Sequence, residues 1–574
     1  DIQKTWWKEA IIYQIYPRSF QDSDGDGIGD LNGITSRLDY IQSLGVDIIW
    51  LNPIFLSPND DNGYDISDYR EIMREFGTME DFDRLLKEIH KREMRLVLDL
   101  VVNHTSDEHP WFEEARKSRH NPYYNYYHWW PAEKGEPPLR LSYFDEEGNA
   151  WMYNKSTDSY YLHYFSRKQP DLNWENPEVR QEIFDMMRFW FDKGIDGFRM
   201  DSISLIAKDP SFPLIDSKKY PDIFSFYAKE PRLHLYLHEM NRQVLSKYDC
   251  MSVGEGSAVM VDDVAKFVDP AREELNMLYH FDAARIRNTT LPDNPESGID
   301  YSLIALKKMF TEWDKAVDKG WPSIYLGNHD QPRMVSRFGS DKDEFRALSA
   351  KMLITFLLTM RGTPYWFAGD EIGMRNIRFD RIEDYNDIDT INRYKKAKAE
   401  GKDPQAVLDE QKETGRDNAR TPFQWDRSPE TGFTAGTPWL KVNPDYTWIN
   451  VADEEKDPTS ILNYFKKVVS FRKENPSLIY GSYHLLDAEN PQSYTFLRKT
   501  GADTYLIMLN FSPKAAISTP GIDMSNAHVL LDNYGDRSHM APQKDITLRP
   551  FEAIVFQLNH PVYESFIDSL DLLE

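Results

Sequence analysis

Short apolar runs alternate with amphipathic stretches along most of the chain. Eight runs have the length and composition of strands, and they cover residues 10–20, 46–53, 96–104, 197–201, 251–255, 278–281, 324–330 and 362–370. The run at 96–104 is almost continuously apolar, as expected of a parallel sheet that is covered on both faces. Between the runs, apolar residues recur at helical spacing, and Thr78 with Asp81 offers a helix cap. This alternation predicts an α/β fold in the form of a (β/α)8 TIM barrel.

Two segments depart from the alternation of strand and helix patterns and predict further domains. Residues 105–173, rich in Tyr, Trp, Pro and His, interrupt the barrel after its third strand as an inserted subdomain. Residues 485–574 contain short strands with turns between them, which indicates a C-terminal antiparallel β domain. The barrel itself would then comprise residues 1–104 and 174–484. Within it, the polar stretch at 389–422 has mixed charges and is interpreted as a solvated helical excursion.

The composition narrows the classes of function. Hydrophobic residues make up 40% of the 574, so a large core can form, and the single cysteine excludes an internal disulfide framework. A formal net charge of -26 argues against nucleic acid as a partner, because phosphate binding needs clustered Lys and Arg. No apolar run approaches the roughly 20 residues of a membrane span, which argues against a membrane partner. We expect a protein of the cytoplasm or periplasm, and the start at Asp1 rather than Met leaves removal of a leader open.

The segment "DSDGDGIGD", Asp22 to Asp30, has the alternating acids and the Gly of a calcium-binding EF-hand loop. An EF-hand needs a helix before the loop, whereas the preceding residues read as a strand. It also needs a bidentate Glu at its twelfth position, which here is Gly33. The pattern therefore disfavours a calcium sensor and leaves a metal-binding turn or a solvated acidic turn.

Titratable residues gather at the ends of the predicted strands, where the active sites of such barrels lie. They are Asp99, His104, Arg199, Asp201, Glu255, His329 and Asp330. A single acid at a strand end is more often a helix cap or an ion-pair partner. Three acids at successive strand ends, with an arginine two residues before one of them, indicate the paired carboxylates that glycoside hydrolysis needs.

The segments that carry these residues resemble a known family. "DLVVNH", "GFRMD", "VGE" and "NHD" are similar to the four signature segments of the α-amylase superfamily, glycoside hydrolase family 13, and "QPDLNW", "GIGDLNGI" and "GTPYWFAGDEIGM" also match. "QPDLN", "DNGYD" and "RDNARTPFQW" are similar to the branch of oligo-1,6-glucosidases and α-glucosidases, which also holds dextran glucosidases and sucrose isomerases. The resemblance covers nearly the whole chain and implies the barrel and a retaining glycosidase.

Catalytic roles follow from the resemblance. It implies that Asp201 is the nucleophile, that Glu255 is the general acid/base, and that Asp330 holds sugar hydroxyls and stabilises the transition state. Arg199 would lower the pKa of Asp201 and keep it ionised, while Glu255 keeps its proton. In a retaining enzyme the two catalytic carboxyl groups should lie roughly 5–5.5 Å apart.

Further binding roles are implied in the same way. The substrate-binding residues would be Asp61, Tyr64, His104, Gln169, Arg199, Ser202, His329 and Arg416. Arg416 is expected to pair with Asp61, a role for which Arg420 is the less favoured candidate. Asp99 is expected to support the site structurally.

The acidic loop also gains a role from the resemblance, because in these glucosidases the same loop binds a calcium ion. The implied ligands of a structural Ca2+ are the side chains of Asp22, Asp24, Asp26 and Asp30 and the carbonyl of Ile28. The alternatives are a more hydrated magnesium ion and an acidic solvent turn. A catalytic metal is not expected, because the two carboxylates suffice for the chemistry.

Two departures from the branch bear on specificity. The branch usually carries Gly-Gly-Ser-Ala-Trp in the insertion, where this chain has "EEGNAW", residues 146–151. The residue after the nucleophile is Ser202, whereas α-1,6-specific members carry Val there.

Three functions are weighed. The first is an exo-acting, retaining α-glucosidase, a monomer that cleaves short gluco-oligosaccharides or sucrose. The second is a sucrose isomerase or transglucosylase that makes isomaltulose or trehalulose, faintly suggested by "FDAARIRN", residues 281–288. The third, a non-catalytic binding protein, is disfavoured because the catalytic residues are kept.

Overall fold

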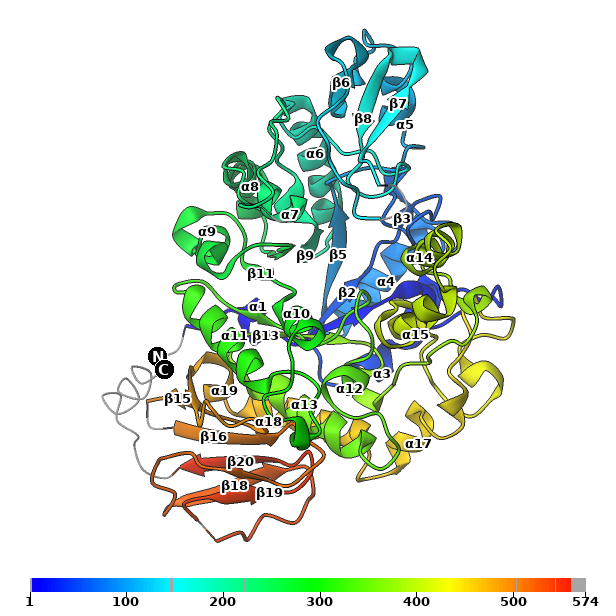
Figure 1. Ribbon diagram of the computed structural model, residues 1–574. Helices are drawn as coiled ribbons and strands as arrows, with labels where there is room; N and C mark the ends of the chain where they lie inside the picture. The colour runs from blue at the N-terminus through cyan, green and yellow to red at the C-terminus, as the bar shows by residue number, and fades with distance from the viewer. Residues whose placement is uncertain (1–2, 145–147, 221, 502, 542, 559–574) are drawn as a thin grey trace.

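The computed structural model describes residues 3–144, 148–220, 222–501, 503–541 and 543–558. Within these residues, eight parallel strands form one sheet at the centre of the molecule, in the order β11-β10-β9-β5-β2-β1-β13-β12 (Figure 1). They are β1 Ile12–Ile15, β2 Ile48–Leu51, β5 Arg95–Val101, β9 Gly197–Asp201, β10 Met251–Glu255, β11 Met277–Tyr279, β12 Ser323–Ile324 and β13 Thr363–Phe367. The two outer strands also meet, since Ser323 Oγ donates to the Leu278 carbonyl at 2.9 Å. The predicted barrel is confirmed.

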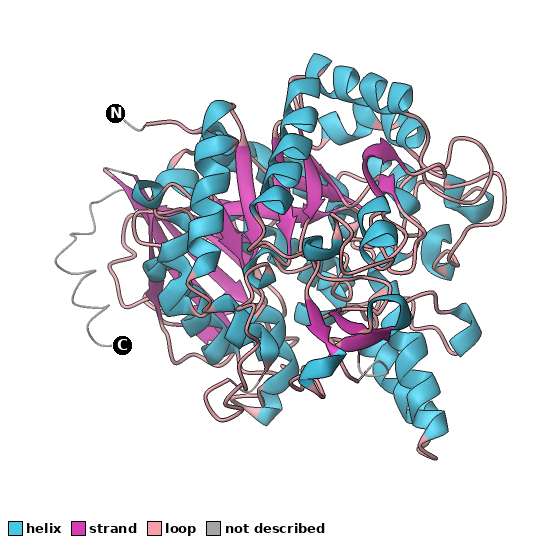
Figure 2. Ribbon diagram, turned by 90° about the horizontal axis from the view of Figure 1, so that it is seen from above, coloured by secondary structure: helices cyan, strands magenta, loops and turns pink. Residues whose placement is uncertain are grey.

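Helices lie around these strands, as Figure 1 and Figure 2 show from two directions. The longer ones are α4 Met79–Lys91, α6 Pro177–Lys193, α8 Arg232–Gln243, α11 Leu303–Ala316, α13 Arg346–Thr359, α14 Ile388–Ala399 and α18 Ile461–Glu474. Shorter ones are α1 Trp6–Glu9, α7 Ile223–Ala228, α9 Val264–Val268, α10 Asp282–Thr289, α12 Met334–Phe338, α15 Pro404–Thr414, α16 Asp417–Arg420, α17 Val451–Lys456 and α19 Ser477–Tyr480. The predicted capping box at α4 is present, because Thr78 and Asp81 each accept a backbone N–H of the other.

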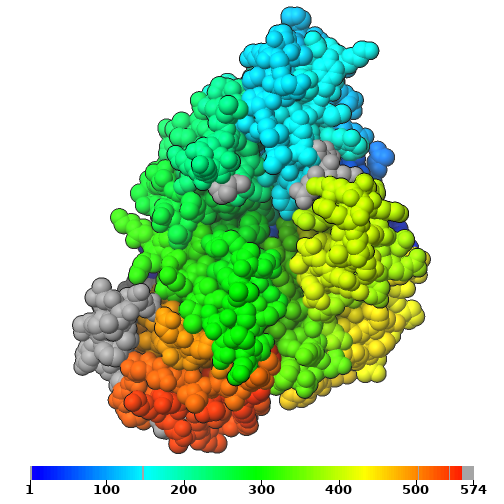
Figure 3. All heavy atoms as spheres, in the orientation of Figure 1, coloured from blue at the N-terminus to red at the C-terminus, as the bar shows by residue number. Residues whose placement is uncertain are grey.

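The inserted subdomain stands above the mouth of the barrel in Figure 1 and Figure 3. It contains α5 Pro110–Ala115 and a small antiparallel sheet of β6 Trp129–Pro131, β8 Ser159–Leu162 and β7 Trp151–Asn154, in that order. Its own core is aromatic, with the Phe112 ring 5.0 Å from that of Tyr127 and 4.9 Å from that of Tyr161. Buried Lys208, beyond β9, forms an ion pair of 3.1 Å with buried Asp171, which fastens the subdomain to the barrel. Glu146 and Glu147 of "EEGNAW" lie outside the described residues.

The C-terminal region forms an antiparallel sheet in the order β14-β15-β16-β20-β18, beside the short pair β17–β19. Its strands are β14 Ser482–Leu486, β15 Ser493–Thr500, β16 Asp503–Asn510, β17 Ala516–Ser518, β18 Ala527–Asp532, β19 Ile546–Leu548 and β20 Ala553–Leu558. Buried Arg498 on β15 donates to the carbonyls of Thr359 and Leu478, each at 2.6 Å, and so joins this sheet to the barrel helices. The predicted boundary at 485 falls within β14, and the domain limits themselves stay a prediction.

Two predicted elements differ in detail. The helical pattern that follows the acidic loop is split into α2 Leu31–Ser36 and α3 Leu38–Ser43, because Arg37 leaves helical geometry with φ -109° and ψ 7°. The predicted strand at 324–330 ends at Ile324. The Asn328 side chain accepts the Asp330 N–H at 2.8 Å, so a turn replaces the end of the strand. A hairpin of β3 Phe55–Leu56 and β4 Asp68–Ile72 follows β2.

Among the described residues, no helix combines the length and the apolar character that crossing a membrane requires.

Candidate active site

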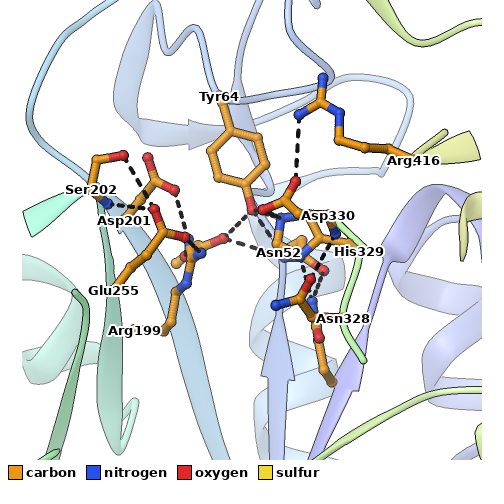
Figure 4. Close-up of polar contacts among 12 residues, drawn as sticks. Asn52, Tyr64, Arg199, Asp201, Ser202, Glu255, Asn328, His329, Asp330 and Arg416 are labelled. Atoms are coloured by element: carbon orange, nitrogen blue, oxygen red, sulfur yellow. Dashed lines mark hydrogen bonds and ion pairs between the residues drawn. The ribbon is translucent and has the colours of Figure 1, made fainter. Parts of the chain in front are cut away.

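A pocket of about 470 Å3 opens at the C-terminal ends of the barrel strands. Eight of the residues predicted for the site line it, namely Asp61, Tyr64, His104, Asp201, Ser202, Glu255, Asp330 and Arg416. The other three, Gln169, Arg199 and His329, are fully buried behind this lining. Figure 4 shows how the side chains around Arg199 and Asp330 converge from separate strands and loops. The predicted residues are thus brought together, although their individual roles stay predictions.

Arg199 is the centre of one half of the site. Its Nη1 lies 2.8 Å from Oδ1 of Asp99 and 2.8 Å from Oδ1 of Asp201. Its Nη2 forms an ion pair with Glu255 Oε2, and its Nε donates to the Tyr279 hydroxyl at 2.8 Å. Three carboxylates and a phenol therefore surround one buried guanidinium, and Asp99 has the supporting position that the sequence predicted.

The two candidate catalytic carboxyl groups have different surroundings. Burial, followed by the charge of Glu255, raises the pKa of Asp201 well above its usual range, and Arg199 opposes this rise. Arg199 thus acts on the pKa of Asp201 in the predicted direction, while the ionisation of the two carboxyl groups stays a prediction. Glu255 accepts from the Tyr279 hydroxyl at 3.0 Å and from the Ser202 N–H at 3.2 Å.

Asp330 and His329 form the other half of the site. The Tyr64 hydroxyl lies 2.7 Å from Nε2 of His329, and the two rings are stacked with centroids 5.5 Å apart. Burial lowers the pKa of His329 to about 3, so this imidazole is neutral near pH 7. Burial opposes ionisation of Asp330, but nearby charged groups, among them Arg416 and Arg420, lower the pKa of this carboxyl, which is therefore ionised.

His104 is also held in a neutral form. Burial lowers its pKa to about 4. Its Nε2 lies 2.9 Å from the Tyr64 carbonyl and 3.2 Å from Nε2 of Gln169. Gln169 in turn donates weakly to Asp61 Oδ2 at 3.4 Å. These contacts link the inserted subdomain to the closed end of the pocket.

Residues 14–481 match the model of the α-amylase catalytic domain. The chain belongs to the α-amylase family. Oligo-1,6-glucosidase of Parageobacillus thermoglucosidasius is 51% identical over 98% of this chain and 100% of that protein, and the same-named protein of Bacillus cereus is 49% identical over 97% and 100%. The crystal structure of the isomaltulose synthase from Protaminobacter rubrum is 42% identical, covers 97% of this chain and 100% of its own, and has a TM-score of 0.91.

Membership of the α-amylase family makes the chain a glycoside hydrolase.

The pocket is also lined by aromatic residues that the sequence analysis did not single out. Phe165 and Tyr143 of the inserted subdomain line the pocket, and the Phe165 ring lies 5.1 Å from that of His104. The aromatic residues of the inserted subdomain thus contribute both to its own core and to the lining of the pocket. Phe281 and Arg285 of "FDAARIRN" also reach the pocket.

Arg416 makes the expected contact with Asp61, but only at 3.7 Å. Its principal partner is Asp387, whose two carboxylate oxygens receive Nη2 at 2.6 Å and Nε at 3.0 Å. Arg420, the less favoured candidate, instead contacts Asp330 at 3.1 Å. Asp387 gave no sequence signal, because an acid at the start of α14 reads as a helix cap, which it also is.

The acidic loop brings three of its acids together. Asp22, Asp24 and Asp30 each offer one carboxylate oxygen, and these oxygens lie within 4.8 Å of one another. Asp26 lies outside this group, and burial, with the neighbouring Asp24 carboxylate adding to it, raises the pKa of Asp26 to about 6. Hard oxygen donors suit Ca2+, and the group fits that ion in donor chemistry.

The two hydrogen bonds between Arg416 and Asp387 lead to a testable prediction. Asp387→Asn removes the charge that holds Arg416 toward Asp61 and Asp330 while keeping a cap for α14. Charge-assisted hydrogen bonds contribute about 1.5–3 kcal/mol, so kcat/KM for p-nitrophenyl α-glucoside should fall roughly 10- to 150-fold. Asp403→Asn is the matched control, because Asp403 caps α15 in the same way and does not line the pocket. Equal kcat/KM for the two variants would contradict the role of Asp387.

Proposed function

We propose that the enzyme is a retaining, exo-acting α-glucosidase that cleaves short α-glucosides through a covalent glucosyl-enzyme. The observation that carries this proposal is the bridge that Arg199 makes between Asp201 and Glu255 at the wall of the pocket. One buried cation thereby holds two carboxyl groups of neighbouring strands beside the same pocket, and double displacement needs such a pair. Asp61, Asp330 and Arg416 line the same pocket and would bind the terminal glucose, which suits removal of single end units.

The reaction follows from these positions. The Asp201 carboxylate attacks the anomeric carbon as the glycosidic C–O bond breaks, and Glu255 transfers its proton to the departing oxygen. Water then attacks the glucosyl-enzyme, Glu255 takes the proton of that water, and the bond to Asp201 breaks. The first step therefore needs the proton on Glu255 and the negative charge on Asp201.

Maltose-type oligosaccharides or sucrose are the proposed substrates. Ser202 lines the pocket beside Glu255 and is smaller than the Val expected of α-1,6-specific members, which leaves room for an α-1,4 or sucrose-type leaving group. The names of the two relatives point instead to α-1,6 bonds. A sucrose isomerase is the second candidate, favoured by the likeness to isomaltulose synthase and by the presence of Phe281 and Arg285 in the pocket. We further expect a monomer that acts in the cytoplasm or periplasm.

Product analysis on sucrose, maltose and isomaltose tests the function. We expect glucose from maltose, and glucose with fructose from sucrose, whereas isomaltulose or trehalulose from sucrose would identify an isomerase. Asp201→Asn and Glu255→Gln should each lower kcat at least 100-fold with an unchanged circular-dichroism spectrum, because losing the nucleophile or the acid typically costs several powers of ten. Either variant keeping a tenth of wild-type kcat would show that the assignment is wrong.

Linkage preference depends, in our proposal, on the volume of residue 202. Ser202→Val and Ser202→Thr add almost the same bulk, and only Thr keeps the hydroxyl that contacts Glu255 Oε1 at 3.3 Å. Both also place a β-branched residue at φ 45°, so they share the same backbone strain. The kcat/KM ratio of isomaltose to maltose should rise about 10- to 200-fold in both.

The wild type is expected to prefer maltose or sucrose over isomaltose. A wild type that prefers isomaltose would refute the volume argument. A ratio that changes in the Val variant alone would assign the effect to the lost hydroxyl instead.

We also propose that the acidic loop binds a structural Ca2+ through Asp22, Asp24, Asp26, Asp30 and the Ile28 carbonyl. The resemblance to the calcium-binding glucosidases and the convergence of three carboxylates support this proposal. The ion would supply a positive charge among these carboxylates and no catalytic step. The loop packs on residues 433–439, with the Asp22 N–H donating to the Phe433 carbonyl and the Trp439 N–H to the Gly27 carbonyl, each at 2.9 Å.

Chelation should therefore lower the melting temperature and leave initial rates at room temperature largely intact, because an ion that binds only the folded state stabilises it by mass action. Differential scanning fluorimetry with and without EDTA, followed by addition of Ca2+ or Mg2+, measures the effect and its metal. An immediate loss of activity in a folded enzyme, reversed by Ca2+, would contradict a purely structural ion.

A further inference from the structure

Tyr279 is the last residue of β11, and its side chain is buried beside Arg199 and Glu255. Its hydroxyl oxygen lies 2.8 Å from Arg199 Nε and 3.0 Å from Glu255 Oε2, and Arg199 Nη2 approaches it as well. The strand register explains this position, because Glu255 and Tyr279 are directly paired across the parallel strands β10 and β11. The phenol is therefore fixed by the sheet itself and not by a loop.

The direction of the phenol proton follows from its neighbours. A phenol has one hydrogen to donate and can accept two hydrogen bonds, whereas a guanidinium only donates. Arg199 donates to the Tyr279 oxygen from both Nε and Nη2. The single hydroxyl hydrogen is then free only for Glu255 Oε2, so Arg199 orients Tyr279 as a donor to this carboxylate.

We propose that Tyr279 is a positioning residue for the general acid/base, holding the Glu255 carboxylate in place after it has given its proton to the leaving group. This inference rests on the proposed glucosidase function. The other carboxylate oxygen, Oε1, accepts from the Ser202 N–H at 3.2 Å and from the Ser202 hydroxyl at 3.3 Å. Donors on both oxygens fix the plane of the carboxylate, which determines where the attacking water can be deprotonated.

Several groups besides Tyr279 act on the ionisation of Glu255. They are Arg199 and Asp201 on β9, Asp99 on β5, Tyr325 after β12, and across the pocket His280 and Asp330. Of the two tyrosines, only Tyr279 donates its hydroxyl hydrogen to the Glu255 carboxylate. The Tyr325 hydroxyl donates to the His280 carbonyl at 2.6 Å instead. Removing the Tyr279 hydroxyl should therefore destabilise the ionised form of Glu255 specifically.

Tyr279→Phe tests the proposal through two pH profiles. In the pH profile of kcat/KM for maltose, the fall at high pH reports loss of the proton from Glu255, the general acid. This basic limb should move up by about one pH unit, because the ionised form of Glu255 has lost a hydrogen-bond donor. With a dinitrophenyl α-glucoside the leaving group needs no proton, so kcat reports the second step, in which Glu255 is the base. The acidic limb of that profile should move up by the same amount. Azide, a nucleophile with no proton to remove, should restore kcat below this limb and yield α-glucosyl azide.

Tyr365→Phe is the matched control, because Tyr365 is a similarly buried tyrosine of the barrel. Among the described residues, the only hydrogen-bond partner of its hydroxyl is the Met277 sulfur, at 3.6 Å. Its two limbs should stay at the wild-type positions. Should Tyr279→Phe fail to fold, 3-fluorotyrosine at position 279 keeps the hydroxyl and makes it a stronger donor, and both limbs should then move down.

The outcomes separate the two proposals. If the limbs of the two pH profiles do not move in Tyr279→Phe, or do not move with 3-fluorotyrosine at this position, the proposed role of Tyr279 is wrong. In that case an inactive Asp201→Asn would still uphold the glucosidase function. A wild type that does not hydrolyse maltose or aryl α-glucosides, or an active Asp201→Asn, would overturn the proposed function itself. Limb shifts of equal size in Tyr365→Phe would show a general effect of losing a buried hydroxyl and would also overturn the inference.

Discussion

The site depends on one buried cation. Arg199 has no exposed surface, and its guanidinium contacts Asp99, Asp201, Glu255 and Tyr279. Taking such a charge out of water costs several kcal/mol, and the cost is offset only when opposite charges and hydrogen bonds surround it. The same need for compensation gathers the carboxylates, so the constraint that keeps the barrel mouth stable also assembles the groups that react. Removing Arg199 would leave three buried carboxyl groups without the cation that they share.

The register of the parallel strands places the groups that compensate the charge of Arg199. Asp99 of β5 is paired directly with Arg199 of β9, and Glu255 of β10 with Tyr279 of β11. Arg199 and Asp201 are two residues apart on one strand and therefore point to the same face. Four neighbouring strands thus deliver the cation, its acids and the phenol to one level of the barrel without any contribution from loops. Loops add the other half of the site, in which Tyr64, His329 and Asp330 meet.

This division explains how much could be predicted from the sequence. The eight strands and the acids at their ends follow from apolar runs and the residues that close them, and the structure places them as predicted. Tyr279 was not found, because a tyrosine in a short apolar run reads as core. Asp387 was not found either, because its pairing with Arg416 joins two loop segments whose approach no local pattern encodes. The break at Arg37 and the early end of β12 show the same limit, since turns set by distant packing override a helical or extended pattern.

Among the described residues, charge in and behind the pocket lining comes from carboxylates and arginines, because burial keeps His104, His280 and His329 neutral. A neutral imidazole can bond a sugar hydroxyl without repelling the positive charge that develops on the glucose ring in an oxocarbenium-like transition state. Asp330 is ionised and held by Arg416 and Arg420, and in the proposed reaction it would stabilise that charge. Lowering the pKa of a histidine and lowering that of an aspartate therefore serve one electrostatic purpose. The first removes a competing cation, and the second keeps an anion available.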